Sequence, residues 1–359
     1  NSEVYRLDLG SSAITALTDR MGPDNNPKVS PNGKQIAYVG QDDKYLGYQL
    51  DELYLMNVDG TNPRKVSADF DRDIGNVQWS GDGKNLFFQY DDNGDTKVGK
   101  LSIASGKVQT VLEGLGGLSL GRPYNAADFS VASDGAIAYT LGNTGQPADL
   151  AVHNRKESLR ITRLNEDLFA FRELGDIEEL RWKSSFDQRE IQGWIVKPPN
   201  FDPNKKYPMI LEIHGGPFAS YGSVFSSEVQ LYAAAGYVVL YTNPRGSSGY
   251  GAEFGNLIHH DYPNHDYEDL MSGVDALLSK GYVDSGNLFV TGGSGGGVLT
   301  AWIVGKTDRF RAAVVAKPVI NWYSFVLYAD NPAFFYKYWF PTKPWEDPEH
   351  YMKRSPLSY

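Results

Sequence analysis

Residues 1–165 contain a pattern that occurs three times, and this repeat limits the fold of the first half more than any other feature. Each copy places a polar turn before a strand of alternating character, as in "SPNGKQIAY". The turn glycines Gly33, Gly83 and Gly135 are about 50 residues apart. Strand, turn and strand at that period are typical of β-propeller blades. An irregular β-sandwich, which needs no repeat, is the alternative.

A second element recurs between these turns, as in "LYLMNVDGTN", and "VYRLDLGSSA" is a degraded form of it. Three blades and a remnant are fewer than the roughly four to eight blades that close a propeller ring. We therefore expect residues 1–165 to form a partial β-propeller of about three blades plus a remnant. The first residue is not Met, and the first ten residues lack the pattern of a signal peptide. Both observations lead us to expect that the natural chain starts before this sequence.

The pattern changes after residue 180 to short apolar strands that alternate with helices. "PMILEIHGG" and "NLFVTGG" contain continuous apolar runs, typical of strands buried on both faces of a parallel sheet. "YEDLMSGVDALLSKG" has its apolar residues on one helical face. This alternation predicts a mostly parallel, doubly wound α/β sheet in residues 191–359, after a linker and first strand region at 166–190. Ligands of such sheets bind at the carboxyl ends of strands.

The composition excludes several classes of function. Because the chain has no cysteine, it has no disulfide, thiolate metal site or cysteine nucleophile. A net charge of -10 argues against nucleic-acid binding, which needs a basic surface. No apolar run approaches the roughly 20 residues that span a bilayer, so no membrane span is predicted. We expect a soluble protein, and the sequence leaves open whether it is cytoplasmic or exported.

The motif Gly-x-Ser-x-Gly occurs twice, around Ser119 and Ser294, and only context separates the two. Ser294 follows a buried strand and precedes a helix expected over residues 298–304. This order matches a nucleophile elbow, where small neighbours permit a strained serine and helix N–H groups face the reacting centre. Ser119 lies in a repeat loop with no helix after it. Ser294 is therefore the predicted catalytic nucleophile, and a phosphate-binding glycine loop at 292–297 is the alternative.

Glycine-rich segments follow two other predicted strands. In "EIHGGPFAS", His214 and two glycines come directly after a strand, where α/β-hydrolases carry the second backbone donor of the oxyanion hole. We interpret His214 as a structural residue, because the triad of that fold runs Ser, then Asp or Glu, then His. In "NPRGSSGYG" the phenol of Tyr250 is a candidate for contact with the oxyanion or the substrate, and a packing role is the alternative.

Three motifs together, "HGGPFASYG", "NPRGSSGYG" and "TGGSGGG", preceded by the repeats, resemble the prolyl oligopeptidase family of serine peptidases, and within it the acylaminoacyl-peptidase branch. The resemblance covers nearly the whole chain. It implies an α/β-hydrolase fold after β-propeller blades, and hydrolysis of short oligopeptides while the propeller keeps folded proteins out. It also implies that Ser294 is the nucleophile and that the N–H groups of Gly295 and Gly216 form the oxyanion hole. Relatives often have Tyr or Asn where this chain has Gly295.

The segment after residue 318 is rich in aromatic residues, as in "INWYSFVLYADNPAFFYKYWF". One interpretation is a hydrophobic cap on the sheet. The other is an apolar substrate pocket beside the scissile bond, formed by Val319, Trp322 and Phe335. Because relatives form their pocket in this region, we expect a mixture of both and a preference for an apolar or aromatic residue there.

A serine nucleophile needs a base, and the base needs a carboxylate that orients it. After Ser294 the only histidine is His350, in a polar loop with prolines, which is a poor position for a base. We therefore expect an α/β domain truncated at its C-terminus, with the triad Asp and His beyond Tyr359. This polypeptide alone is then expected to be inert, with a complementary C-terminal fragment or a second copy in a homo-oligomer as candidate partners.

We expect no cofactor and no metal ion. Adjacent histidines such as His259 and His260 cannot easily face one ion, and their segment leads into a helix whose first turn favours acids. Two other functions stay open: an esterase or lipase, against which the propeller counts, and a propeller-bearing binding protein without catalysis. Dipeptidyl peptidases hold a free amino terminus with paired glutamates. Glu178 and Glu179 are adjacent but lie in the link between the halves, so exopeptidase and endopeptidase are not distinguished.

Overall fold

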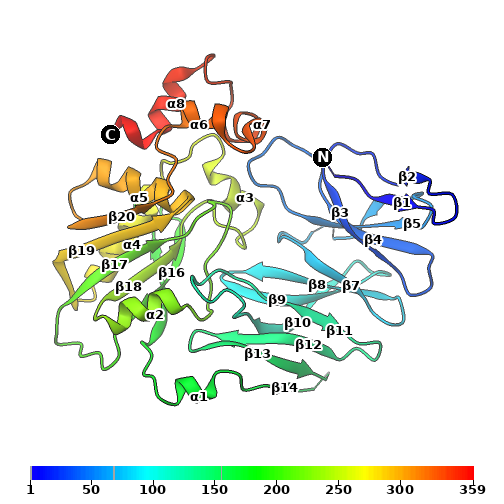
Figure 1. The fold of residues 1–359 in the computed structure, drawn as a ribbon, viewed down its shortest axis with the longest axis horizontal. Helices are drawn as coiled ribbons and strands as arrows, with labels where there is room; N and C mark the ends of the chain where they lie inside the picture. The colour runs from blue at the N-terminus through cyan, green and yellow to red at the C-terminus, as the bar shows by residue number, and fades with distance from the viewer. Residues whose placement is uncertain (1, 68, 155) are drawn as a thin grey trace. The chain divides into compact units, whose positions relative to one another are not determined.

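The computed structural model describes residues 2–67, 69–154 and 156–359 (Figure 1). Contacts within these residues divide the chain into two units, each with its own apolar core. The first unit contains the repeats. The second unit contains the α/β part together with two short segments of the first half, Tyr45–Tyr48 and Leu120–Tyr124. These segments bring residues of distant sequence into the unit that carries Ser294.

The first unit consists of short antiparallel strands. A hairpin near the N-terminus is followed by three groups of four strands, and each group pairs its strands in chain order. The last strand of the second group also pairs with the second strand of the third group, Leu115 with Leu141, so these two groups form one eight-stranded sheet. Antiparallel groups of four are the pattern of a propeller blade, so the predicted repeat corresponds to three blade-type meanders. The hairpin is β1 (Tyr5–Leu7) and β2 (Ile14–Ala16), and the meanders are β3 (Asp24–Val29), β4 (Gln35–Gly40), β5 (Glu52–Asn57) and β6 (Arg64–Lys65); β7 (Gly75–Trp79), β8 (Asn85–Asp92), β9 (Asp95–Ser102) and β10 (Val108–Leu115); and β11 (Phe129–Val131), β12 (Ile137–Asn143), β13 (Gln146–His153) and β14 (Ser158–Arg160).

The same turn connects the first two strands of each meander. In the first copy the Ser30 N–H donates to the Gln35 carbonyl at 2.8 Å, and the Gly33 N–H donates to the Ser30 carbonyl at 2.9 Å. Equivalent pairs of bonds close the turns at Gly83 and Gly135. The three turn glycines have φ of 70°, 67° and 88°, a left-handed conformation that only glycine adopts at little cost. This demand explains why glycine recurs at the same place in each copy.

Side chains of β7 link the three meanders. Trp79 Nε1 donates to the Lys28 carbonyl of the first meander at 2.8 Å. Gln78 Nε2 donates to the Phe129 carbonyl of the third meander at 2.7 Å, and the Val131 N–H donates to Gln78 Oε1 at 3.0 Å. The second meander is therefore hydrogen-bonded to both of the others.

The second unit is built on a six-stranded sheet with strand order β15, β16, β18, β17, β19, β20. β16 pairs antiparallel with both of its neighbours, while the pairs from β18 to β20 are parallel. A mixed sheet with mostly parallel strands agrees with the predicted α/β fold. The strands are β15 (Ile177–Lys183), β16 (Glu190–Val196), β17 (Tyr207–Ile213), β18 (Val238–Asn243), β19 (Val283–Gly293) and β20 (Ala312–Ala316).

Helices cover both faces of this sheet, as the side chains of β18 show. Val238 and Leu240 pack with α4 and α5, whereas Val239 and Tyr241 pack with α2. Because successive side chains of a strand point to opposite faces, α2 lies on one face and α4 and α5 lie on the other. The helices are α1 (Glu166–Phe169), α2 (Ser227–Ala234), α3 (Ala252–Gly255), α4 (Asp266–Leu278), α5 (Gly295–Lys306), α6 (Trp322–Tyr328), α7 (Pro332–Phe334) and α8 (Pro348–Arg354), with the shorter turns η1 (Asn256–Ile258), η2 (Phe335–Trp339) and η3 (Pro356–Ser358). Within the described residues, no helix is long and apolar enough to cross a membrane.

Helix α5 begins at Gly295, three residues earlier than the sequence predicts. The sequence prediction fails here because glycine is a poor helix former. Tertiary contacts override that tendency, since a Cβ on Gly296 would lie 2.1 Å from the Ile213 carbonyl oxygen. A Cβ on Gly297 would lie 2.3 Å from the Ala316 carbonyl oxygen. The first turn of α5 therefore fits between the ends of β17 and β20 only because it carries no side chains.

The aromatic segment near the C-terminus folds into α6 to α8, drawn in orange and red in Figure 1. Trp322 is 1% exposed, and its ring contacts Phe325, Phe335 and Phe340. These rings belong to or pack against the same apolar cluster as α4 and α5. The segment thus buries part of its aromatic residues in the core of the second unit, while Tyr328 and Trp345 are exposed.

Candidate active site

Ser294 stands at the turn between β19 and α5. Its backbone has φ 56° and ψ −117°, outside the regions that non-glycine residues ordinarily occupy. The Ser294 N–H donates to the Ala316 carbonyl at 3.0 Å, and the Ser294 carbonyl accepts from the Val298 N–H at 2.9 Å. Bonds to the end of β20 and to α5 therefore hold the strained conformation in place. This is the backbone geometry of a nucleophile elbow.

Close backbone packing requires glycine two positions before and two positions after the serine, at Gly292 and Gly296. A Cβ on Gly292 would lie 2.4 Å from the Gly296 carbonyl oxygen, and a Cβ on Gly296 would meet the end of β17 as described above. Backbone atoms of a sheet and a helix cannot move aside for a side chain. The Gly-x-Ser-x-Gly pattern at 292–296 therefore follows from the crossing of strand and helix.

The loop after β17 brings Gly216 against Gly295. A Cβ on Gly295 would lie 3.0 Å from the Gly216 nitrogen, so the two backbones are in contact. Among the described residues no acceptor takes the N–H of either glycine, whereas the Gly215 N–H donates to the Tyr124 hydroxyl at 2.7 Å. Two backbone donors without a protein partner thus lie beside Ser294, which is what stabilisation of an oxyanion requires.

His214 lies between the two glycine-rich loops. It is 3% exposed, and burial lowers the pKa of its imidazole to about 4. Its Nδ1 lies 2.7 Å from the Gly215 carbonyl oxygen and its Nε2 lies 2.9 Å from the Ser247 hydroxyl. A buried, neutral imidazole whose two nitrogens contact these groups orients loops and is not arranged to accept a proton from Ser294.

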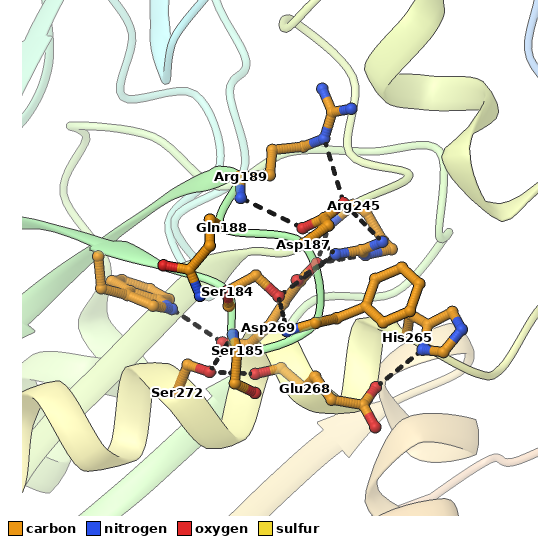
Figure 2. Close-up of polar contacts among 12 residues, drawn as sticks. Ser184, Ser185, Asp187, Gln188, Arg189, Arg245, His265, Glu268, Asp269 and Ser272 are labelled. Carbon is orange, nitrogen blue, oxygen red and sulfur yellow. Dashed lines mark hydrogen bonds and ion pairs between the residues drawn. The ribbon is translucent and has the colours of Figure 1, made fainter.

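Arg245, in the loop after β18, is held by a buried carboxylate (Figure 2). Its Nε and one Nη donate to Asp269 of α4 at 2.9 and 2.8 Å, and its backbone N–H donates to the same carboxylate at 2.9 Å. It also donates to Asp187, between β15 and β16, at 3.2 Å. The Arg245 side chain is 3% exposed and that of Asp269 is 0% exposed. The ion pair thus anchors the loop that carries Ser247.

Sequence reasoning did not single out Arg245 and Asp269. The usable signal is in α4, where Asp266 and Asp269 continue the apolar stripe that contains Leu270, Val274 and Leu277. An acid on an apolar helical face needs a buried partner. An arginine directly after a fully buried strand supplies it.

The phenol of Tyr250, predicted as a further oxyanion contact, is engaged elsewhere in this structure. Asn243 Nδ2 donates to the Tyr250 hydroxyl at 2.7 Å, and the hydroxyl donates to Gln192. Its ring packs on Phe254. The structure therefore places Tyr250 at the ends of β16 and β18, and it does not bring it into the pocket beside Ser294.

A pocket of about 450 Å³ opens beside Ser294. Its lining includes the serine, two glycines of the β17 loop, one phenol and two cations. These residues are Ser294, Gly215, Gly216, Tyr124, Arg122 and Lys317. Both Tyr124 and Arg122 come from the segment Leu120–Tyr124, whose contribution no sequence pattern predicts.

Arg122 is paired with two glutamates. It donates through Nε to Glu228 of α2 at 3.0 Å, and one Nη lies 3.4 Å from Glu212 of β17. Glu212 is completely buried and accepts a hydrogen bond from the Tyr221 hydroxyl at 2.9 Å. Burial raises the pKa of Glu212 to about 7, although the Arg122 charge opposes this effect. The two carboxylates thus offset the charge of the guanidinium, and neither glutamate lines the pocket.

The three residues predicted to form an apolar substrate pocket are not among those that line the pocket beside Ser294. Trp322 is buried, and Val319 and Phe335 pack against the same apolar cluster. The prediction of an apolar pocket in the aromatic segment is neither supported nor contradicted by these positions and stays a prediction.

The second serine motif has a different setting. Ser119 lies between β10 and β11 in the first unit, and the next element along the chain is a strand. In the described residues, no histidine is hydrogen-bonded to the Ser294 hydroxyl. The other histidines make contacts elsewhere: His153 with Ser158, His259 with the Gly47 N–H, His260 with the His259 ring, and His265 with Glu268. Within the part of the chain that the structure describes, no hydrogen-bond partner is found for His350 Nε2.

Comparison with known proteins gives matches to peptidases. Residues 223–359 match the model of the prolyl oligopeptidase family. An uncharacterized peptidase of Bacillus subtilis, YuxL, is 35% identical over 284 residues, which are 78% of this chain and 42% of YuxL. Dipeptidyl-peptidase 5 of Porphyromonas gingivalis is 29% identical over 320 residues, which are 88% of this chain and 46% of that protein.

A solved structure is similar over almost the whole chain. The acylaminoacyl peptidase of Pyrococcus horikoshii matches with a TM-score of 0.84 at 25% identity, over 99% of this chain and 54% of that one. The likeness to these peptidases implies an α/β-hydrolase unit after propeller-type blades, as the sequence predicts. The chain spans about half the length of the relatives that it matches.

Proposed function

We propose that this chain, which belongs to the prolyl oligopeptidase family through residues 223–359, carries the nucleophile and the oxyanion hole of a serine peptidase. The main support for this assignment is the strained backbone of Ser294 at the strand–helix turn. The N–H groups of Gly295 and Gly216, which no acceptor takes among the described residues, lie beside it. Short peptides are the proposed substrates, because the relatives are named as acylaminoacyl and dipeptidyl peptidases.

In the proposed mechanism Ser294 Oγ attacks the carbonyl carbon of the scissile peptide bond. The negative charge that develops on the carbonyl oxygen is stabilised by the N–H groups of Gly295 and Gly216. Collapse of the tetrahedral intermediate breaks the C–N bond, and the leaving amine takes up the proton that the serine lost. An acyl ester on Ser294 results, and water hydrolyses it in a second step.

Proton transfer requires a base within hydrogen-bond reach of Ser294 Oγ. No histidine among the described residues is in that position, and the ring of His214 is already bonded on both nitrogens. We therefore propose that these 359 residues are inert by themselves and need a histidine and a carboxylate from elsewhere. The blade-type meanders of the first unit are proposed to act as a size filter in the complete peptidase.

Labelling with a fluorophosphonate probe tests the proposal, because the probe reports an activated serine directly. The protein at its natural length is compared with its Ser294→Ala and Ser119→Ala variants. Labelling and peptide hydrolysis are expected to vanish in Ser294→Ala and to persist in Ser119→Ala, whose serine has the same motif in another setting.

The alternatives give different results. Hydrolysis of simple esters without any hydrolysis of peptides would favour an esterase. A protein at its natural length that is not labelled at Ser294 would favour a binding protein without catalysis. Labelling of the isolated 359 residues as fast as the natural-length protein would contradict the proposed lack of a base.

A further inference from the structure

The pocket beside Ser294 is lined by two cationic side chains, Arg122 and Lys317, and, among the residues that the structure describes, by no carboxylate. The other lining residues are uncharged. A pocket lining that carries cations and no anion attracts a negatively charged group of a bound molecule.

Lys317 has a fixed place relative to the nucleophile. It directly follows Ala316, whose carbonyl accepts the Ser294 N–H at 3.0 Å. Its backbone has φ 50°, a left-handed conformation that is uncommon for a lysine. The chain therefore turns at Lys317, one residue after the contact that holds the serine.

The Lys317 side chain is exposed and, in the part of the chain that the structure describes, no hydrogen bond or ion pair engages its ammonium group. An unpaired ammonium in a pocket is available for a ligand. It would act as a point charge with three donors.

Arg122 lies close to the residue before the serine. A Cβ on Gly293, the residue before Ser294, would lie 3.0 Å from an Arg122 Nη. Glu228 and Glu212 form ion pairs with the guanidinium, and neither glutamate lines the pocket. They hold the planar group in place, and both Arg122 and Lys317 line the same pocket.

From this arrangement we propose that Lys317, together with Arg122, forms a subsite for a carboxylate of the peptide close to the bond that Ser294 attacks. The inference rests on the proposed peptidase function and adds the substrate class. Two groups of a peptide supply this chemistry: the side chain of an Asp or Glu next to the scissile bond, and the terminal carboxylate of a short peptide. Either would form charge-assisted hydrogen bonds to the two cations.

Lys317 is the residue to change, because removal of Arg122 would leave Glu212 buried without its cation. Lys317→Met removes the charge and keeps the length of the side chain, and Lys317→Arg keeps the charge. Lys205→Met is the matched control. Lys205 is an exposed lysine just before the start of β17, whereas Ser294 follows the end of the parallel strand β19, so the two lie at opposite ends of the strands.

The experiment measures kcat/KM of the natural-length protein for pairs of peptides. One pair has Glu or Gln next to the scissile bond, and the other has a free acid or an amide at the C-terminus. In one of the two peptide pairs we expect kcat/KM to be about fivefold higher for the peptide with the carboxylate. This ratio corresponds to an ion pair worth about 1 kcal/mol. Lys317→Met should abolish the preference, while Lys317→Arg and Lys205→Met retain it. The pair that responds identifies the source of the carboxylate.

Three results would overturn the inference: equal rates within both pairs, a preference for the neutral peptides, or an unchanged carboxylate preference in Lys317→Met. Failure of the peptidase function itself gives a different result, because Ser294 would then not be labelled by fluorophosphonate. Labelling of Ser294 together with equal rates would reject the carboxylate subsite alone.

Discussion

The Nε2 of His214 lies 2.9 Å from the hydroxyl of Ser247, and this contact joins the loop after β17 to the loop after β18. The first loop carries Gly216, whose N–H is a proposed oxyanion donor. The second loop is held by the ion pair of Arg245 and Asp269. A chain of buried contacts thus runs from α4 to the backbone donors beside Ser294.

Replacement of Ser247 by alanine should slow the reaction. The substitution leaves a buried imidazole nitrogen without a partner, and it releases the loop that positions Gly216. We expect kcat of the natural-length protein to fall by about tenfold with a smaller change in KM, because the oxyanion donors act in the transition state. Ser248→Ala is the control, since among the described residues its hydroxyl makes one contact, a long one of 3.4 Å with Ser220. Equal kcat values for the two variants would reject the role of the contact.

Replacement of Asp269 by asparagine should destabilise the second unit. Asp269 is fully buried and accepts three hydrogen bonds from Arg245. Its neutralisation removes the buried counter-charge of the guanidinium and leaves it the longer ion pair with Asp187, whose side chain is 28% exposed. Loss of one partner of a buried pair costs about 3 kcal/mol of unfolding free energy. Urea denaturation followed by tryptophan fluorescence measures it.

The control for Asp269 lies on the same helix. Asp275 forms an ion pair with Arg309, but its side chain is 63% exposed. Asp275→Asn should cost less than about 1 kcal/mol, as exposed pairs do. If both variants unfolded at the same urea concentration, the Arg245–Asp269 pair would not be the anchor that its burial indicates.

Replacement of Gly296 by alanine should prevent the elbow from forming. The new Cβ would lie 2.1 Å from the Ile213 carbonyl oxygen, and neither the end of β17 nor the first turn of α5 can move without loss of the strained serine. We expect labelling of Ser294 in the natural-length protein to fall below detection. Gly286→Ala on β19 is the control, because its nearest neighbour is a side-chain oxygen at 3.4 Å. Normal labelling of Gly296→Ala would contradict this prediction, because it would mean that the backbone around Gly296 can accommodate a Cβ.

Features that depend on neighbouring residues were predictable from the sequence. The turn at Gly33 repeats because its φ requires glycine, and the elbow at Ser294 combines a buried strand, small residues and a helix within 20 positions. The start of α5 was placed too late, because the packing that forces three glycines into a helix involves β17 and β20.

The contacts that complete the site come from distant sequence and left no local signal. Arg122 and Tyr124 belong to the segment Leu120–Tyr124, which packs with the second unit although it lies between strands of the first. Tyr124 binds the Gly215 N–H, 91 positions away. No periodicity or spacing connects these positions, so only the folded chain identifies them as neighbours of Ser294.

Glu212 should make the stability of the second unit depend on pH. Burial raises the pKa of this carboxyl group from 4.5 to about 7, so the folded state binds more protons than the unfolded state in this window. The contribution of Glu212 to stability is therefore fully present below about pH 4.5 and is lost as the pH rises to about 7. Glu212→Gln does not titrate. Its stability relative to the unchanged protein should rise between pH 5 and 7 by at most about 1.4 kcal/mol per pH unit.

Urea denaturation of both proteins at pH 5, 6, 7 and 8 measures this difference. Glu349→Gln, at an exposed position of α8, controls for the loss of one carboxyl group. A difference between Glu212→Gln and the unchanged protein that stays constant with pH would show that Glu212 is ionised throughout. In that case the effect of the Arg122 charge on the pKa of Glu212 would outweigh the effect of burial. Glu212 would then be a charged partner of Arg122 at every pH tested.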